Sequence, residues 1–269
     1  MTARPAAGGG RWVTVAPERV ERWIEGFTAR HGAAEVTATP DLVRLTAAGG
    51  AVAECHVPFP PLAVQPGEPS GRPFGASPGQ PIAETPGHPL ESPLAHPLVH
   101  PFGHPPDRFL GVSEAVAALA AHARRDRLVG VLLVRLGGYA AGVFDGERLV
   151  ASKVGSRQVH GRSAAGGWSQ QRFARRREKQ SGEALGAAAE VAARVLLPYA
   201  GDLEAVLLGG DRRAIDGVRG DRLLAPLLAL EREPFLTVPD PRLAVLRETP
   251  GLFRAVRVRV LDQGASGGA

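Results

Sequence analysis

The sequence predicts a mixed α/β protein in which a small β-α-β-β module precedes a larger mixed sheet with helices. Three observations carry this prediction. Apolar residues recur with helical and strand periods, glycine-containing turns separate three consecutive strand-like runs, and prolines concentrate in one internal stretch. The chain has 269 residues, of which 44% are hydrophobic and 22% charged, enough for one large or two small domains with a core.

The N-terminal α+β module is expected over residues 11–62. Pro17 suits the first position of a helix, and Gly32 is expected to end that helix. Its apolar residues recur at i, i+3, i+4 and i+7: Val20, Trp23, Ile24 and Phe27. Alternating apolar runs predict strands at 12–15, 35–39, 42–46 and 51–57.

A disordered linker, rich in proline, glycine and histidine, is expected over residues 63–106. From Pro58 to Pro106, 15 of 49 residues are proline, which blocks helix interiors and central strands. Each of four histidines in this stretch precedes a proline: His88, His96, His100 and His104. Because these prolines prevent the histidines from sharing a helix face, we interpret the segment as a flexible spacer and expect no metal site.

The larger domain is expected over residues 107–262. Ser113 is predicted to cap a helix ending at Arg124 and Arg125, and a β-meander follows with strands at 128–135, 139–144 and 148–154. Further helices are predicted at 182–197, 212–218, 223–230 and 241–247, and strands at 203–208, 234–238 and 256–261. A meander followed by αβ units resembles the mixed sheet of ribonuclease-H-like folds.

Hydropathy and cysteine content indicate a cytoplasmic protein. The longest apolar run, Leu128 to Val134, is far shorter than the roughly 20 residues needed to span a bilayer, and residues 1–10 lack the apolar core of a signal peptide. The one cysteine, Cys55, cannot form an intramolecular disulfide or a cysteine-based zinc site, and we expect it to be a small core residue. We expect a monomer without a cofactor or membrane partner.

Positive charge is concentrated between Ser152 and Gln180. This segment has eight Lys or Arg and one acidic residue, Glu178, a net charge of +7, whereas the whole chain carries +5. The remainder therefore sums to −2. Clustered cations are suited to neutralising phosphates, so the segment predicts a contact with a polyanion. Residues 170–180 can form a helix, but only Phe173 and Ala174 are apolar there, which favours a solvated or partner-bound segment.

Gly166-Gly167-Trp168-Ser169-Gln170-Gln171, followed by an arginine-rich stretch, resembles the catalytic loop of the Vms/ANKZF-like ribosome-rescue release factors. That family carries a G-x-x-Q motif after a strand and before a long helix, in a domain related to the middle domain of eukaryotic peptide release factors. The motif matches Gly167-x-x-Gln170, and the resemblance extends over residues 107–262. The Cys/His zinc finger and ankyrin repeats of the eukaryotic members have no counterpart here.

The resemblance implies hydrolysis of the ester that joins a nascent peptide to tRNA, with the rRNA of the large ribosomal subunit and peptidyl-tRNA as partners. Gln170 would position the attacking water, the backbone at Gly166 and Gly167 would approach the tRNA end, and Ser169 would belong to the catalytic group. The implied RNA-binding residues are Arg157, Arg162, Trp168, Gln171, Arg172, Arg175, Arg176, Arg177 and Lys179. Trp168 is equally compatible with packing on its own domain.

Two alternative functions stay open at this point. A non-catalytic module that binds rRNA or tRNA would need the arginines but not the Gly-Gly-x-x-Gln arrangement. A ribonuclease-H-like nuclease would need clustered carboxylates to hold two metal ions, whereas the acids near predicted strand ends, Asp145, Glu147 and Asp202, form no convincing set.

Overall fold

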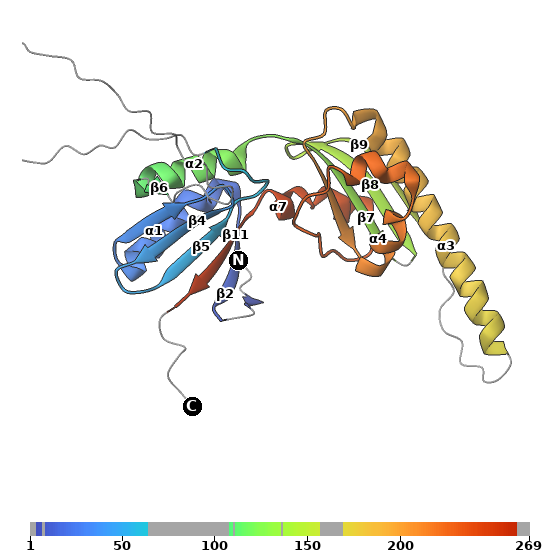
Figure 1. The fold of residues 1–269 in the computed structure, drawn as a ribbon, viewed down its shortest axis with the longest axis horizontal. Helices are drawn as coiled ribbons and strands as arrows, with labels where there is room; N and C mark the ends of the chain where they lie inside the picture. Colours follow the sequence, from blue (N-terminus) through green and yellow to red (C-terminus); the bar gives the residue numbers. More distant parts are fainter. Residues whose placement is uncertain are drawn as a thin grey trace, which may run out of the picture.

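The chain forms two β-sheets, each with its own helices, in a computed structural model (Figure 1). The structure describes residues 4–6, 9–63, 108–109, 111–135, 137–156 and 169–262, with only the backbone at 108–109, 169–179 and 181. The predicted linker, 63–106, lies outside these residues except for its first position. The mixed α/β fold class predicted from the sequence is confirmed.

The first sheet has seven antiparallel strands in the order β1-β2-β11-β5-β4-β3-β6. The strands are β1 (Arg4–Pro5), β2 (Arg11–Val15), β3 (Ala34–Ala38), β4 (Leu42–Ala47), β5 (Val52–His56), β6 (Arg108–Phe109) and β11 (Val256–Leu261). A 3-10 turn, η1 (Pro17–Arg19), leads into α1 (Val20–His31), and α2 (Val112–Arg124) packs beside α1. These helices cover one face of the sheet, so its strands alternate between buried and exposed residues.

The predicted N-terminal elements are confirmed at this sheet. Val20, Ile24 and Phe27 are buried beneath α1, and Gly32 ends the helix with φ 91°, a conformation that favours glycine. Cys55 is fully buried, and burial raises the pKa of its thiol to about 12, as expected for an unreactive core residue. The predicted cap of the next helix is wrong: α2 begins at Val112 after Gly111, and no side chain caps it.

The second sheet has four strands in the order β10-β7-β8-β9. Its predicted antiparallel meander is confirmed as β7 (Leu128–Arg135), β8 (Gly138–Asp145) and β9 (Arg148–Ser156). Strand β10 (Ala205–Gly210) lies parallel to β7 after the long crossover helix α3 (Ser169–Leu196). The helices that follow are α4 (Arg212–Arg219), α5 (Ala225–Leu228), α6 (Leu243–Arg247) and α7 (Pro250–Phe253), with 3-10 turns η2 (Leu197–Tyr199) and η3 (Arg222–Leu224).

Two predicted elements near the C-terminus differ from the observed ones. The helix expected at 223–230 is divided between η3 and α5. The strand expected at 234–238 forms only an isolated bridge, between Gly209 and Leu236. Pro234 has no N–H to donate to a ladder, which limits pairing at its start.

Strand β11 forms where the sequence predicts it but belongs to the first sheet, between β2 and β5. Helix α2 also packs on this sheet, against α1 and β3. The first sheet therefore draws on residues both before 62 and after 107, and the second sheet is inserted between α2 and β11. Strand β11 joins the first sheet because it is amphipathic: buried valines alternate with more exposed arginines, which suits a sheet with only one covered face.

A joint of aromatic and arginine side chains connects the two sheets, and α7 lies between them in Figure 1. Phe253 of α7 makes edge-to-face contacts with Phe59, which follows β5, and with Phe144 of β8, at centroid distances of 5.9 and 6.0 Å. Arg127 is 6% exposed, lies over the Phe59 ring, and donates to the carbonyl oxygen of His122 at 2.9 Å. Arg254 pairs with Asp126 and with Glu147, at 3.3 and 2.9 Å. We call Phe59, Arg127, Phe144, Phe253 and Arg254 the joint.

Candidate functional site

The candidate site segment lies between β9 and α3, as predicted. Strand β9 ends at Ser156 and α3 begins at Ser169. Of the predicted catalytic residues, Ser169 and Gln170 are the first two residues of α3, whereas Gly166 and Gly167 lie outside the described residues. The predicted strand, connecting segment and helix thus occur in that order, with the motif glutamine at the start of the helix.

The predicted RNA-binding residues divide in the same way. Arg157, Arg162 and Trp168 lie outside the part of the chain that the structure describes. The others belong to the first three turns of α3: Gln171, Arg172, Arg175, Arg176, Arg177 and Lys179. Positions 172, 175, 176 and 179 are spaced i, i+3, i+4 and i+7, which puts them on one side of a regular helix.

Helix α3 is a single helix of 28 residues, longer than the predicted element at 182–197. At 1.5 Å per residue it extends about 42 Å. Its C-terminal half is anchored to the second sheet and α4 by small and branched residues, all buried: Ala188, Ala189, Val191, Ala192, Ala193, Val195 and Leu196. Ser169 precedes the first of these anchors by about 28 Å along the helix axis.

The N-terminal half of α3 projects past the edge of the second sheet, away from the first sheet (Figure 1). Gly182 and Glu183 are exposed, and the residues from Ala184 onward become progressively buried. The helix leaves the sheet at this point. The geometry therefore holds the Ser169-Gln170 end of the helix, together with its arginine positions, well away from the core that anchors it.

The end of β9 is fixed by a contact that the sequence analysis missed. Tyr139 of β8 lies directly opposite Gly155 of β9, and its ring packs over the glycine: a Cβ added to Gly155 would be 2.4 Å from the Tyr139 Cζ atom. Only glycine leaves room for the ring there. Gly155 is the last residue but one of β9, so a larger side chain there would disturb the strand end from which the chain continues toward the motif. Counting back through the Asp145-Gly146 turn would pair Tyr139 with Val154, and a register shift between Val143 and Phe144 moves the partner to Gly155, so the sequence alone does not identify this pair.

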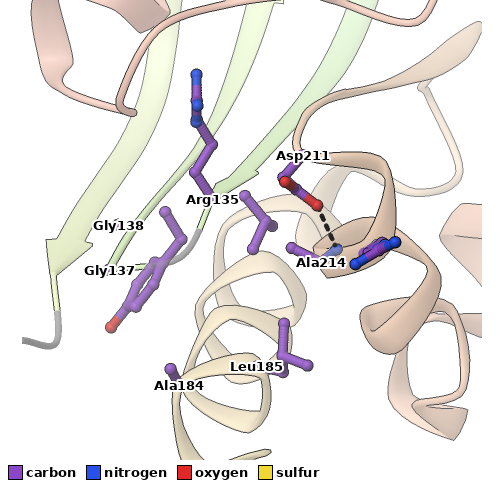
Figure 2. A pocket seen from close by; sticks show the side chains of 10 residues that line it. Arg135, Gly137, Gly138, Ala184, Leu185, Asp211 and Ala214 are labelled. Carbon is purple, nitrogen blue, oxygen red and sulfur yellow. Dashed lines mark hydrogen bonds between the residues drawn. The ribbon is translucent and has the colours of Figure 1, made fainter. Parts of the chain in front are cut away.

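A pocket of about 300 Å³ lies where the β7–β8 hairpin meets α3 and α4 (Figure 2). Leu185 and Tyr139 contribute to its lining, and Asp211 accepts a hydrogen bond from the Ala214 N–H at 3.1 Å, which caps α4. Arg135 donates to the Val238 carbonyl oxygen at 2.9 Å. Because Leu185 follows Gln170 by about 22 Å along α3, this pocket is separate from the motif and we assign it no part in the chemistry.

Two of the three carboxylates considered for a nuclease site, Asp145 and Glu147, are engaged elsewhere. Asp145 pairs with Arg148 at 2.7 Å, and Glu147 pairs with Arg254 of the joint. Within the described ranges, no group of three or more His, Cys, Asp or Glu residues could hold a metal ion. None of the helices in those ranges is long and apolar enough to cross a membrane.

Comparison with known proteins assigns a family to the second sheet and the strand that follows it. Residues 127–259 match a family model described as "Actinobacteria/chloroflexi VLRF1 release factor". No curated protein sequence matches the chain. The matched region begins just before β7 and ends within β11, so it includes β9, α3 and the motif between them.

Solved structures with a similar arrangement include the archaeal translation termination factor aRF1, at 17% identity and a TM-score of 0.35, with 47% of this chain and 36% of that chain covered. Another is described only as an archaeal protein, at 19% identity and a TM-score of 0.34, with 53% and 36% covered. The chain thus spans about a third of the length of these structures. The family match carries the assignment: residues 127–259 belong to the VLRF1 release-factor family, the Vms-like group that the sequence resembles.

Proposed function

We propose that this protein hydrolyses peptidyl-tRNA on stalled large ribosomal subunits, in the cytoplasm, through its G-x-x-Q loop. Membership of a release-factor family supports a role in translation release or rescue. One structural observation favours the finer proposal: α3 begins with Ser169 and Gln170, and about 28 Å separates Ser169 from Ala188, which is fully buried in the core of the second sheet. A slender, basic helix of that length suits a site enclosed by RNA, because it can carry a reactive loop into a confined space while the domain stays outside.

The proposed chemistry needs no titrating side chain. Water adds to the carbonyl carbon of the peptidyl ester, and the peptide acid leaves the 3′ oxygen of the terminal tRNA ribose, which takes up a proton. Glutamine has one amide donor group and one carbonyl acceptor, so Gln170 would orient the water and, with a backbone N–H, stabilise the developing oxyanion. Gly166 and Gly167 would let the backbone approach the ester, and Ser169 would lie next to the reacting atoms.

The basic residues supply affinity in this proposal. The side of α3 defined by positions 172, 175, 176 and 179 is entirely cationic, and Arg177 adds a further charge. Together with Arg157 and Arg162 they would contact phosphates of rRNA or tRNA, Gln171 would contact the RNA backbone, and Trp168 would stack on a base. The first sheet and residues 63–106 are not required for the chemical step, and we propose that the protein acts as a monomer without a cofactor.

A release assay tests this proposal. Purified large subunits carrying peptidyl-tRNA are mixed with the full-length protein, and the freed peptide is measured against time and salt concentration. We expect release, and binding that weakens steeply as salt rises, because each phosphate that the protein neutralises releases counterions and adds to the slope of log K against log salt. Replacing Arg172, Arg175 and Arg176 by glutamine should reduce that slope by about three. Replacing exposed Arg212, Arg213 and Arg222 in the same way provides a control of equal charge on another surface.

Failure of the proposal has two distinguishable forms. If the protein binds large subunits with the expected salt dependence but releases no peptide, the non-catalytic RNA-binding module replaces the hydrolase. If binding is independent of salt and unaffected by the α3 substitutions, the projecting helix does not contact RNA and both proposals are wrong. Cleavage of the RNA itself would instead favour the nuclease.

A further inference from the structure

The face of the first sheet opposite α1 and α2 carries an unusual set of side chains. Successive side chains of a strand point to opposite faces of the sheet, so the core residues point toward the helices and the residues between them point to the face that the helices do not cover. Strand register places members of this second set next to one another, with Trp12 opposite Arg259, Arg257 opposite His56, and Glu54 opposite Arg44. We call this surface the open face; its charged and aromatic members are Arg4, Trp12, Glu35, Arg44, Glu54, His56, Arg257 and Arg259.

Three planar groups lie together at the centre of the open face. The Trp12 and His56 rings are 5.1 Å apart between centroids, and the Arg257 guanidinium lies 4.7 Å from the centroid of the Trp12 ring. Trp12 is only half-buried, and His56 and Arg257 are exposed. The hydrophobic core of this part of the chain lies on the opposite side of the sheet, so these groups do not serve it. The two rings are inclined to each other by 52°, and with Arg257 they form an aromatic and cationic patch across β2, β11 and β5 on which another planar group can stack.

The charge of the open face is positive. Its four arginines outnumber its two glutamates, Glu35 and Glu54, for a net charge of +2. Both Arg44 and Arg259 lie 3.6 Å from carboxylate oxygens of Glu54, so one carboxylate is shared between two cations. Arg257 has no carboxylate within ion-pair distance among the residues that the structure describes. Positive charge therefore surrounds the stacking groups.

Stacking groups surrounded by cations on an antiparallel sheet suit one class of partner. Unpaired bases stack on aromatic and guanidinium planes while arginines bind the phosphates between them, whereas a duplex hides its base faces. We infer that the open face binds single-stranded RNA, with Trp12 and His56 stacking on bases and Arg44, Arg257 and Arg259 binding the backbone. The choice of RNA over DNA rests on the release-factor family of the chain; the stacking surface itself is independent of peptide release.

The sheet that carries this site and the projecting half of α3 lie at different ends of the molecule. Figure 1 shows α3 on the outer side of the second sheet, with the first sheet beyond the joint. A protein with both sites contacts RNA at two separated places. The joint then has a function, because it fixes the direction from one contact to the other.

Fluorescence anisotropy tests the inference with labelled single-stranded oligonucleotides of mixed sequence. Full-length protein with Arg172, Arg175, Arg176 and Arg177 replaced by glutamine is used, so that four of the five cations at the start of α3 are removed. In this background we expect binding to RNA and weaker binding to a duplex. Trp12→Ala should weaken it by about fivefold to 150-fold, the range for loss of one stacked base. Arg257→Gln should also weaken it, whereas Arg22→Gln, an equal loss of charge at an exposed position of α1, should not.

Each outcome decides the inference, provided that circular dichroism shows the variants to be folded. If Trp12→Ala is unstable, Arg257→Gln and Arg44→Gln, both at exposed positions, carry the test. Equal RNA affinity for these variants, the control and the parent overturns the inference, as does the absence of binding once the α3 arginines are removed. Equal affinity for RNA and single-stranded DNA overturns the choice of RNA. None of these measurements involves a ribosome, so the result is independent of whether the protein releases peptides.

Discussion

Replacing Phe253 by alanine tests the joint between the two sheets. Phe253 is 2% exposed. Its ring contacts Phe59, which follows strand β5 of the first sheet, and Phe144, which belongs to strand β8 of the second sheet. Deleting a buried phenylalanine ring costs about 3–5 kcal/mol, because apolar burial is lost and a cavity is left behind. Because the ring also forms two edge-to-face aromatic pairs, the expected cost of deleting it is in the middle of that range or above. We therefore expect the free energy of unfolding to fall by about 4 kcal/mol.

Thermal unfolding followed by circular dichroism measures this loss. For a chain of this size, each kcal/mol lowers Tm by about 2–4 °C, so Phe253→Ala should lower Tm by about 8–16 °C. The neighbouring Leu252 is 42% exposed, and Leu252→Ala should change stability by less than about 0.5 kcal/mol. Equal melting temperatures for the two variants would refute the packing described for the joint. A separate early transition in Phe253→Ala alone would indicate that the ring couples two otherwise independent units.

Three further predictions concern the helix, the strand end and the joint. Gly182→Ala and Gly186→Ala should each raise the free energy of unfolding, measured by chemical denaturation, by about 0.5–1 kcal/mol. The reason is that α3 gains a helix former and nothing lies within 4 Å of either new Cβ. Gly209→Ala is the contrasting variant and should lower the free energy of unfolding, because its Cβ would be 2.5 Å from the Leu236 carbonyl oxygen. Gly155→Ala should slow peptide release more than it weakens large-subunit binding, since it displaces Tyr139 and redirects the chain toward the motif, whereas equal effects on both would contradict that role. Burial, and then the Arg127 cation, lower the pKa of His122, although the carbonyl oxygens of Pro58 and Phe59 act in the opposite direction. The unfolded chain therefore takes up the proton first, and stability should fall as pH drops through the ordinary histidine pKa of about 6.5 toward the lowered pKa of the folded state. His122→Gln should flatten that dependence in urea titrations.

Local patterns were sufficient to predict most of the fold. The helix period of Val20, Ile24 and Phe27, the Asp145-Gly146 turn and the continuous apolar run at 128–135 each identify an element from its own residues. Periodicity does not specify which strand pairs with which. The partners of β11 are more than 200 residues away in sequence, and only its alternation of valine and arginine favoured a half-exposed sheet over the buried strands around β7.

The candidate site was predicted unevenly for the same reason. The glycine-glutamine motif and the clustered arginines could be identified from the sequence alone, and the structure puts Ser169 and Gln170 at the start of α3. The contact between Tyr139 and Gly155 is a cross-strand pair, so it depends on register. The open face depends on the insertion of β11 between β2 and β5, because that pairing alone brings Arg257 to Trp12. Features that combine distant segments required the three-dimensional structure.

The most direct test of the account is the rate of peptide release by Gln170→Ala beside Gln171→Ala. Successive helical positions diverge by about 100°, so only one of the two glutamines can face the ester, and the motif spacing favours Gln170. We predict that Gln170→Ala lowers single-turnover release on peptidyl-tRNA-bearing large subunits by about 100-fold or more while co-sedimentation is unchanged, and that Gln171→Ala is milder. Full release activity in Gln170→Ala, with normal binding, would contradict the account.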